Sequence, residues 1–233
     1  MSELATYERD GSIGTIVLDD GKVNVFSIPM LRAVHAALDE ADRDGVVVVL
    51  TGRENYFSAG FDLKVFTGEA DPVLEMLTLG ATLAERVLSW PRPVVVACTG
   101  HAYPAGAFLL LAADLRIGAD GPFRIGLNEV RIGLTVPWFA IELARHRLHP
   151  AHFDRTVVNA TMYSPQDAVA PGFLDRVVAP ADLRAVSLEA AAGLAELDAQ
   201  AHAATKGRAR AGAVAALRSA IDSELTVGGW VPG

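Results

Sequence analysis

The sequence is poor in cysteine and carries an excess of acidic side chains. Cys98 is the only cysteine among 233 residues, so no intramolecular disulfide and no cysteine-rich zinc site can form. The chain has 20 Lys and Arg against 28 Asp and Glu, a formal net charge of -8. This balance argues against a nucleic-acid binder that works by neutralising many phosphates, although a local basic patch could serve a small anionic ligand.

Long apolar runs and several common catalytic motifs are also missing. The longest apolar stretches, 45–50 and 108–113, are far shorter than the roughly 20 residues of a membrane span. The first residues, 1–4, contain no basic region followed by an apolar stretch, so we expect a cytoplasmic protein with no membrane partner. No P-loop, G-x-G-x-x-G, H-E-x-x-H or G-x-S-x-G motif occurs. The histidines are scattered, three of them around Pro150, and we expect no metal site.

What the sequence does contain is ample apolar material, 51% of its residues, in alternating strand and helix patterns. Residues 4–18 are typical of a hairpin around Asp10-Gly11, and a helix over 27–44 precedes a buried strand over 46–50. This alternation predicts an α/β fold with a largely parallel sheet and crossover helices. Further predicted elements are helices at 72–88, 104–112, 137–147, 151–158, 164–170, 181–197 and 202–225, and strands at 94–98, 114–119 and 173–178.

The patterns also predict how the chain is organised. We expect an α/β core over residues 1–148 that extends in sequence to a strand at 176–179. A mainly helical C-terminal region is expected over 149–233. No repeat or low-complexity linker separates the two parts.

Two strand-to-helix junctions are the best candidates for a ligand site. Residues 56–64 follow the first buried strand, and residues 99–106 follow the strand over 94–98. Parallel sheets bind ligands at the carboxyl ends of their strands. The first N–H groups of a helix lack internal partners and lie at the positive end of its dipole, and small residues such as Ala59-Gly60 let a ligand approach. Two such donors on one carbonyl oxygen would form an oxyanion hole. The alternative is two tight glycine turns without a ligand.

Both junctions resemble the signature stretches of the crotonase (enoyl-CoA hydratase/isomerase) superfamily. The resemblance implies a crotonase-like (ClpP/crotonase) fold, a spiral of ββα units with a helical C-terminal trimerisation region, and a homotrimer or hexamer. It also implies an enzyme of fatty acid metabolism that acts on an acyl-CoA thioester, with CoA entering as part of the substrate and no separate cofactor. The similar stretches are 57–64, 93–106, 113–117, 125–134, 164–168 and 172–178, in order and at family spacing.

The resemblance assigns roles to individual residues. Phe61 and Ala105 occupy the positions whose backbone N–H groups bind the thioester oxygen, and Glu129 occupies a catalytic glutamate position. Phe108 stands where hydratases of the family carry a second glutamate. Lys64 either faces the CoA phosphates or is an exposed lysine on a solvated turn. The implied acyl-CoA-binding residues are Ala59, Gly60, Phe61, Asp62, Leu63, Lys64, Ala105 and Phe108.

The exchange of the second glutamate for Phe108 changes which reaction is expected. Hydration needs one group to take a proton from water and another to supply one to the α-carbon, which a lone carboxylate beside an apolar wall does poorly. Moving a double bond from the 3,4 to the 2,3 position needs a single base, and the wall would raise the pKa of Glu129 and exclude water. Residues 126–129 and Pro137-Trp138 resemble the mitochondrial-type Δ3,Δ2-enoyl-CoA isomerase branch.

We therefore expect conversion of 3-enoyl-CoA to 2-enoyl-CoA by a single-glutamate proton shuttle. The alternatives are an enoyl-CoA hydratase with an unrecognised second acid and a non-catalytic acyl-CoA-binding protein. Glu142 is the second-choice carboxylate. Asp62 and Asp114 are expected to act only as turn or cap residues.

The last long helix begins with a basic cluster, residues 206–210. It is expected to be a solvated basic face or a contact for the 3′-phosphate of CoA, supplied to a neighbouring subunit. Nucleic-acid binding is not expected because no aromatic residues are interleaved with the basic ones. Because the chain ends at 228–233, the final helix of the family, and the pocket lid it contributes, are expected to be shortened.

Overall fold

A six-stranded sheet forms the centre of the fold in the computed structural model, which describes residues 4–226. The first two strands form an antiparallel hairpin, and every later neighbour in the sheet is parallel, as the sequence predicts. The strands in sheet order are β1 (Ala5–Asp10), β2 (Ile13–Leu18), β4 (Val47–Thr51), β7 (Val94–Cys98), β9 (Leu115–Ala119) and β10 (Arg176–Val178).

Four short strands form a second layer of two parallel pairs, β3 with β6 and β5 with β8. A strand of the main sheet is thus followed by short strands and then by a helix, twice in succession: two short strands in β4–β5–β6–α2 and one in β7–β8–α3. This repeat is the ββα unit expected for the spiral. The short strands are β3 (Val25–Phe26), β5 (Asn55–Ser58), β6 (Gly60–Phe61) and β8 (Gly100–Ala102), with 3-10 turns at η1 (Val65–Thr67), η2 (Val130–Ile132) and η3 (Pro180–Asp182).

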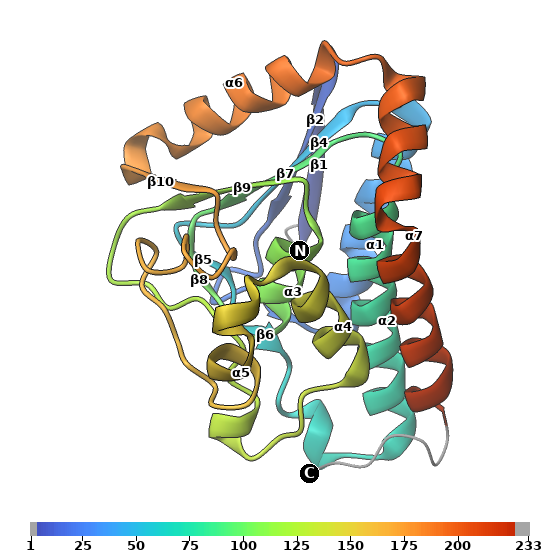
Figure 1. Ribbon diagram of the computed structural model, residues 1–233, viewed down its shortest axis with the longest axis vertical. Coiled ribbons are helices and arrows are strands. Elements are labelled where there is room, and N and C mark those ends of the chain that lie inside the picture. Colours follow the sequence, from blue (N-terminus) through green and yellow to red (C-terminus); the bar gives the residue numbers. More distant parts are fainter. Residues whose placement is uncertain (1–3, 227–233) are drawn as a thin grey trace.

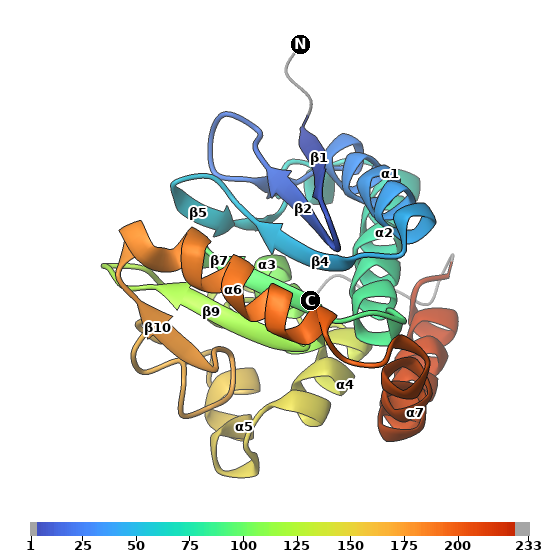
Figure 2. The ribbon, with the colours of Figure 1, turned by 90° about the horizontal axis from the view of Figure 1, so that it is seen from above.

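Helices cover both faces of the sheet (Figures 1 and 2). Helix α6 packs on one face, against β4, β7 and β9, whereas α1, α2 and α3 enclose the larger core on the other. Helix α7 lies along α2 and α4. None of the helices within residues 4–226 is long and apolar enough to cross a lipid bilayer. The helices are α1 (Ile28–Asp44), α2 (Ala70–Ser89), α3 (Ala105–Ala112), α4 (Trp138–Arg147), α5 (Pro150–Val157), α6 (Leu183–Ala195) and α7 (Ala199–Glu224).

Local sequence explains where α1 begins and ends. Ser27 accepts a hydrogen bond from the N–H of Met30 at 3.3 Å, and Pro29 lies in the first turn, where its missing N–H costs nothing. Gly45 ends the helix in the left-handed conformation with φ of 63°. The chain then enters the buried valines of β4.

The helix expected over 164–170 is wrong. Ser164 does accept a hydrogen bond from the N–H of Asp167, as a cap would, but 165–170 forms only turns, because Pro171 follows and Gly172 has a φ of 101°. The strand expected over 173–178 is also too long. The N–H groups of Phe173 and Leu174 bond to the carbonyl of Ala168 instead of the sheet, so that β10 begins only at Arg176.

Candidate active site

The two junctions singled out from the sequence lie against each other. The N–H of Tyr103, before α3, donates to the carbonyl of Ser58 at 3.1 Å. Gly60 has a φ of 90°, and a Cβ placed on it would lie 2.4 Å from Cδ of Pro104 and 2.7 Å from the carbonyl oxygen of Tyr103. Only glycine combines this φ with so close an approach, so Gly60 is what lets the two loops meet.

Asn24, which no sequence pattern indicates, holds the first loop through hydrogen bonds to its backbone and to Ser58. It is fully buried with a φ of 54°, a conformation that asparagine tolerates better than most residues. Its Nδ2 donates to the carbonyls of Leu18 and Phe57, and its own carbonyl accepts from Oγ of Ser58 at 2.7 Å. Oγ of Ser58 in turn accepts from the N–H of Gly60. This network fixes the backbone immediately before Phe61. No motif marks Asn24, because its partners in the loop, Phe57 and Ser58, are 33 and 34 residues away.

Phe61 and Ala105 are the residues expected to supply backbone donors. Ala105 is the first residue of α3, so its N–H has no acceptor within the helix and lies at the positive end of the helix dipole. Phe61 lies in β6 directly after Gly60, at the point where the two loops meet. Both neighbourhoods reach the same cavity, since Phe61 and Pro104 line it.

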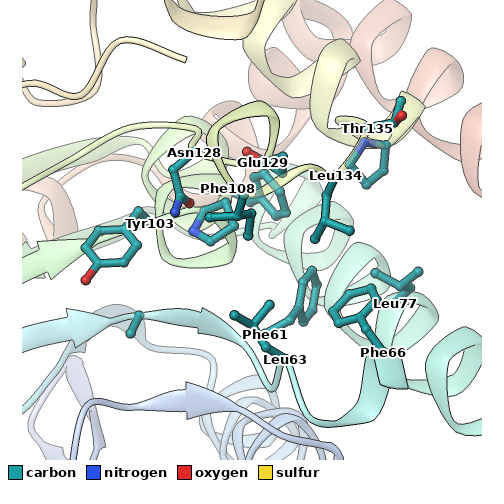
Figure 3. A pocket seen from close by; sticks show the side chains of 14 residues that line it. Phe61, Leu63, Phe66, Leu77, Tyr103, Phe108, Asn128, Glu129, Leu134 and Thr135 are labelled. Carbon is teal, nitrogen blue, oxygen red and sulfur yellow. The ribbon is translucent and has the colours of Figure 1, made fainter. Parts of the chain in front are cut away.

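That cavity has a volume of about 110 Å³ and is largely apolar (Figure 3). Aromatic and aliphatic side chains from β6, α2, α3 and the segment before α4 point into it. Within the described part of the chain, Glu129 is the only carboxylate that lines it. The lining residues are Ala59, Phe61, Leu63, Phe66, Leu77, Tyr103, Pro104, Phe108, Asn128, Glu129, Ile132, Leu134, Thr135 and Pro137.

Glu129 is a buried carboxylate with no counterion in the described part of the chain. It is 4% exposed, and neither carboxylate oxygen has a hydrogen-bond partner within residues 4–226. Burial raises the pKa of Glu129 from its ordinary value of 4.5 to about 7. The main chain holds it in place, because its carbonyl accepts the N–H groups of Ile132 and Leu134. An unpaired buried carboxylate destabilises the fold, and one in a cavity with a raised pKa is typical of a general base.

Phe108 forms part of the apolar wall of the cavity. Its side chain is 2% exposed on α3. The ring centroid lies 6.2 Å from that of Phe61 and 5.4 Å from that of Phe139, the second pair edge to face. These packed rings make this part of the cavity wall apolar; that Phe108 replaces a second glutamate stays a prediction.

The remaining predicted binding residues lie around the first loop. Oδ1 of Asp62 accepts the N–H of Lys64 at 3.0 Å, so Asp62 forms a turn, as expected. Leu63 is 55% exposed and lines the cavity, whereas Lys64 is exposed. Glu142 lies elsewhere on α4 and pairs with Arg145 at 3.6 Å. Their roles toward a substrate stay predictions.

The expectation of a solvated basic face is wrong for two residues of the 206–210 cluster. Lys206 is 7% exposed, and its Nζ lies 2.6 Å from Asp114. Arg210 contacts the other oxygen of Asp114 at 2.8 Å and donates to the carbonyls of Leu88 and Ala112. Asp114 also accepts the N–H of Val94, so its role is structural but larger than that of a turn residue. This pairing could not be predicted from local sequence patterns, because Asp114 is 92 residues from Lys206.

Two other expectations concern a metal and the C-terminus. Across residues 4–226, no three His, Cys, Asp or Glu side chains are grouped as a metal ion would require. The end of the chain, residues 228–233, lies outside the described residues, and α7 is described to Glu224.

A spiral of ββα units that brings a helix start, a glycine loop and one buried carboxylate to an apolar cavity defines an acyl-CoA enzyme of the crotonase type. The chain belongs to the enoyl-CoA hydratase/isomerase family, whose model matches residues 8–228. It therefore acts on an acyl-CoA thioester, as an enoyl-CoA isomerase or hydratase.

The known proteins that are similar to this chain include some named as enoyl-CoA hydratases and some named as enoyl-CoA isomerases. A crystal structure of an enoyl-CoA hydratase/isomerase family protein from Pseudomonas syringae is 46% identical with a TM-score of 0.93, over 95% of this chain and 96% of that one. A protein from Mycobacterium tuberculosis, called an enoyl-CoA isomerase in one structure and a probable enoyl-CoA hydratase in another, is 44% identical with a TM-score of 0.92, over 96% of this chain and 98% of that one in the first structure. A probable enoyl-CoA hydratase from Mycobacterium avium is 31% identical over 88% of this chain and 80% of that protein. The narrower likeness to the mitochondrial isomerase branch stays a prediction.

Proposed function

We propose that this enzyme isomerises 3-enoyl-CoA to 2-enoyl-CoA with Glu129 as its only proton carrier. The observation that carries the proposal is the cavity itself. Among the described residues that line it, Glu129 is the single carboxylate, and the buried ring of Phe108 is part of its apolar wall.

The reaction begins with polarisation of the thioester. Its carbonyl oxygen accepts hydrogen bonds from the N–H groups of Phe61 and Ala105, which stabilise the negative charge that develops on that oxygen. The ionised carboxylate of Glu129 then removes a proton from C2, and the electron pair of that C–H bond moves toward the carbonyl to give a dienolate.

Return of the proton completes the reaction. The neutral carboxylic acid of Glu129 donates the proton to C4, where the C3–C4 double-bond pair forms the new C–H bond. The C1–C2 double-bond pair becomes the C2–C3 double bond, the enolate oxygen re-forms the carbonyl, and the carboxylate is regenerated. No atom is gained or lost. A pKa of about 7 suits both halves of the cycle, because the group must accept and release a proton near neutral pH. The packed rings of Phe61, Phe108 and Phe139 exclude the water that would compete for C3.

The experiment is a comparison of two substrates on pure protein. Incubation with a 3-enoyl-CoA is expected to give 2-enoyl-CoA, and incubation with a 2-enoyl-CoA is expected to give little 3-hydroxyacyl-CoA. The hydratase names of several relatives make hydration the second candidate. Rapid formation of 3-hydroxyacyl-CoA would establish hydration instead. Tight acyl-CoA binding in calorimetry with no turnover of either substrate would establish a binding protein.

A further inference from the structure

Phe61 carries two functions in one residue. Its backbone N–H is the proposed donor to the thioester oxygen, and its ring forms part of the cavity wall. The ring is 8% exposed and faces Phe108 on one side (Figure 3). What lies on its other side therefore determines how much of the cavity the ring fills.

Helix α2 supplies that other side through a glycine. Gly80 is buried in the middle of the helix, where alanine would be the better helix former. A Cβ placed on Gly80 would lie 2.4 Å from Cε1 and 2.5 Å from Cζ of Phe61. Ordinary carbon contacts require about 3.5 to 4 Å, so the ring occupies the space that a methyl group would need.

We propose that Gly80 is a specificity-determining residue that seats the Phe61 ring against α2 and so sets how long an acyl chain the cavity admits. This rests on the proposed acyl-CoA site. With any side chain at position 80, the ring must swing away from the helix. Phe108 and Phe139 are already packed on the far side, so the remaining free space is the cavity. Leu77, one turn earlier on α2, lines the same cavity.

The substitution is expected to change the cavity and leave the fold intact. The atoms that the new methyl group would meet are at the far end of the Phe61 side chain, which can turn without moving backbone. Two other helical glycines provide matched controls. A Cβ on Gly193 in α6 or on Gly212 in α7 would meet nothing within 4 Å.

The test measures binding of saturated acyl-CoA thioesters, which do not react, so that its result is independent of whether the enzyme isomerises or hydrates. Calorimetry compares butanoyl-CoA with octanoyl-CoA for wild type, Gly80→Ala, Gly193→Ala and Gly212→Ala. Gly80→Ala is expected to weaken octanoyl-CoA about tenfold relative to butanoyl-CoA, the size of effect that small changes in an apolar pocket produce. The two controls are expected to keep the wild-type ratio.

A second substitution on the ring distinguishes this role from general damage. Phe61→Leu keeps the backbone N–H and shortens the side chain, so Gly80→Ala/Phe61→Leu is expected to recover octanoyl-CoA binding. Phe61→Leu alone is expected to favour octanoyl-CoA over butanoyl-CoA. An unchanged ratio in Gly80→Ala, or no recovery in the double variant, would overturn the role of Gly80. Failure of all variants and wild type to bind either thioester would overturn the acyl-CoA site itself.

Discussion

Replacing Glu129 by glutamine is expected to stabilise the fold while it removes the proposed base. The carboxylate is 4% exposed, has no hydrogen-bond partner for either oxygen among residues 4–226, and has its pKa raised by burial from 4.5 to about 7. Between these two values the native protein holds a proton that the unfolded chain has released. Stability is therefore fully retained below about pH 4.5 and falls as the pH rises through 7, because ionisation then costs the native state more than the unfolded state.

The magnitude follows from the two pKa values. At about 1.4 kcal/mol for each tenfold change in proton affinity, the rise from 4.5 to about 7 corresponds to roughly 3 kcal/mol of lost stability at alkaline pH. Glutamine cannot ionise, so the advantage of Glu129→Gln over wild type should grow by roughly 2 to 3 kcal/mol between about pH 5 and pH 8. For a chain of this length that is about 5 to 10 °C in melting temperature.

The assay is thermal and urea unfolding across this pH range at one fixed protein concentration. Any constant difference between the two side chains, such as the volume or the polarity of the amide, cancels in the change with pH. Glu189→Gln, on the exposed side of α6, is the control and should show no growing advantage. A difference between wild type and Glu129→Gln that stays the same from pH 5 to 8 would refute the reasoning, since it would mean that Glu129 ionises as easily in the fold as in the unfolded chain.

Three further predictions follow from the site and its supports. Because Glu129 must be ionised to take the C2 proton, kcat/KM for 3-enoyl-CoA should rise with pH and level off above about 7; a flat profile from pH 5 to 9 would contradict its role as base. Gly60→Ala, which sets a Cβ against Tyr103 and Pro104, should reduce kcat/KM on the order of a hundredfold, while Gly212→Ala should not. Asp114→Ala leaves Lys206 and Arg210 without their common partner, and urea unfolding should show a loss of about 3 to 5 kcal/mol; a loss below about 1 kcal/mol would mean that the buried pairs contribute little.

Much of the fold could be predicted because its elements have strong periodicity. Buried valine runs predict the strands β4 and β7, and a cap with apolar residues at helical spacing predicts α1. The strands β3, β5, β6 and β8 are two to four residues long, too short for any period to appear, and they exist because the neighbouring loop supplies the partner. The segment 165–170 begins with the cap sequence of a helix, but Pro171 and the left-handed Gly172 limit it to turns.

The candidate site shows the same division. The glycine loops and the lone Glu129 are visible in the sequence, and the fold brings residues of both loops and Glu129 to one cavity. Asn24, Gly80 and the pairing of Asp114 with Lys206 are not visible, because each depends on a contact with a distant part of the chain. The basic cluster over 206–210 has no acidic neighbour in the sequence, so a solvated face is the natural prediction, but the fold places Asp114 against Lys206 and Arg210.

The most direct test of the central claim is the rate at which wild type, Glu129→Gln and Glu142→Gln convert a 3-enoyl-CoA into 2-enoyl-CoA. Glu142 is a matched control because it lies on α4 in an ion pair with Arg145, outside the cavity. We expect Glu129→Gln to lose at least about a hundredfold in kcat, typical of removing a general base, while Glu142→Gln stays near wild type. A loss of less than about tenfold in Glu129→Gln, with the protein still folded and binding acyl-CoA, would contradict a single-glutamate isomerase.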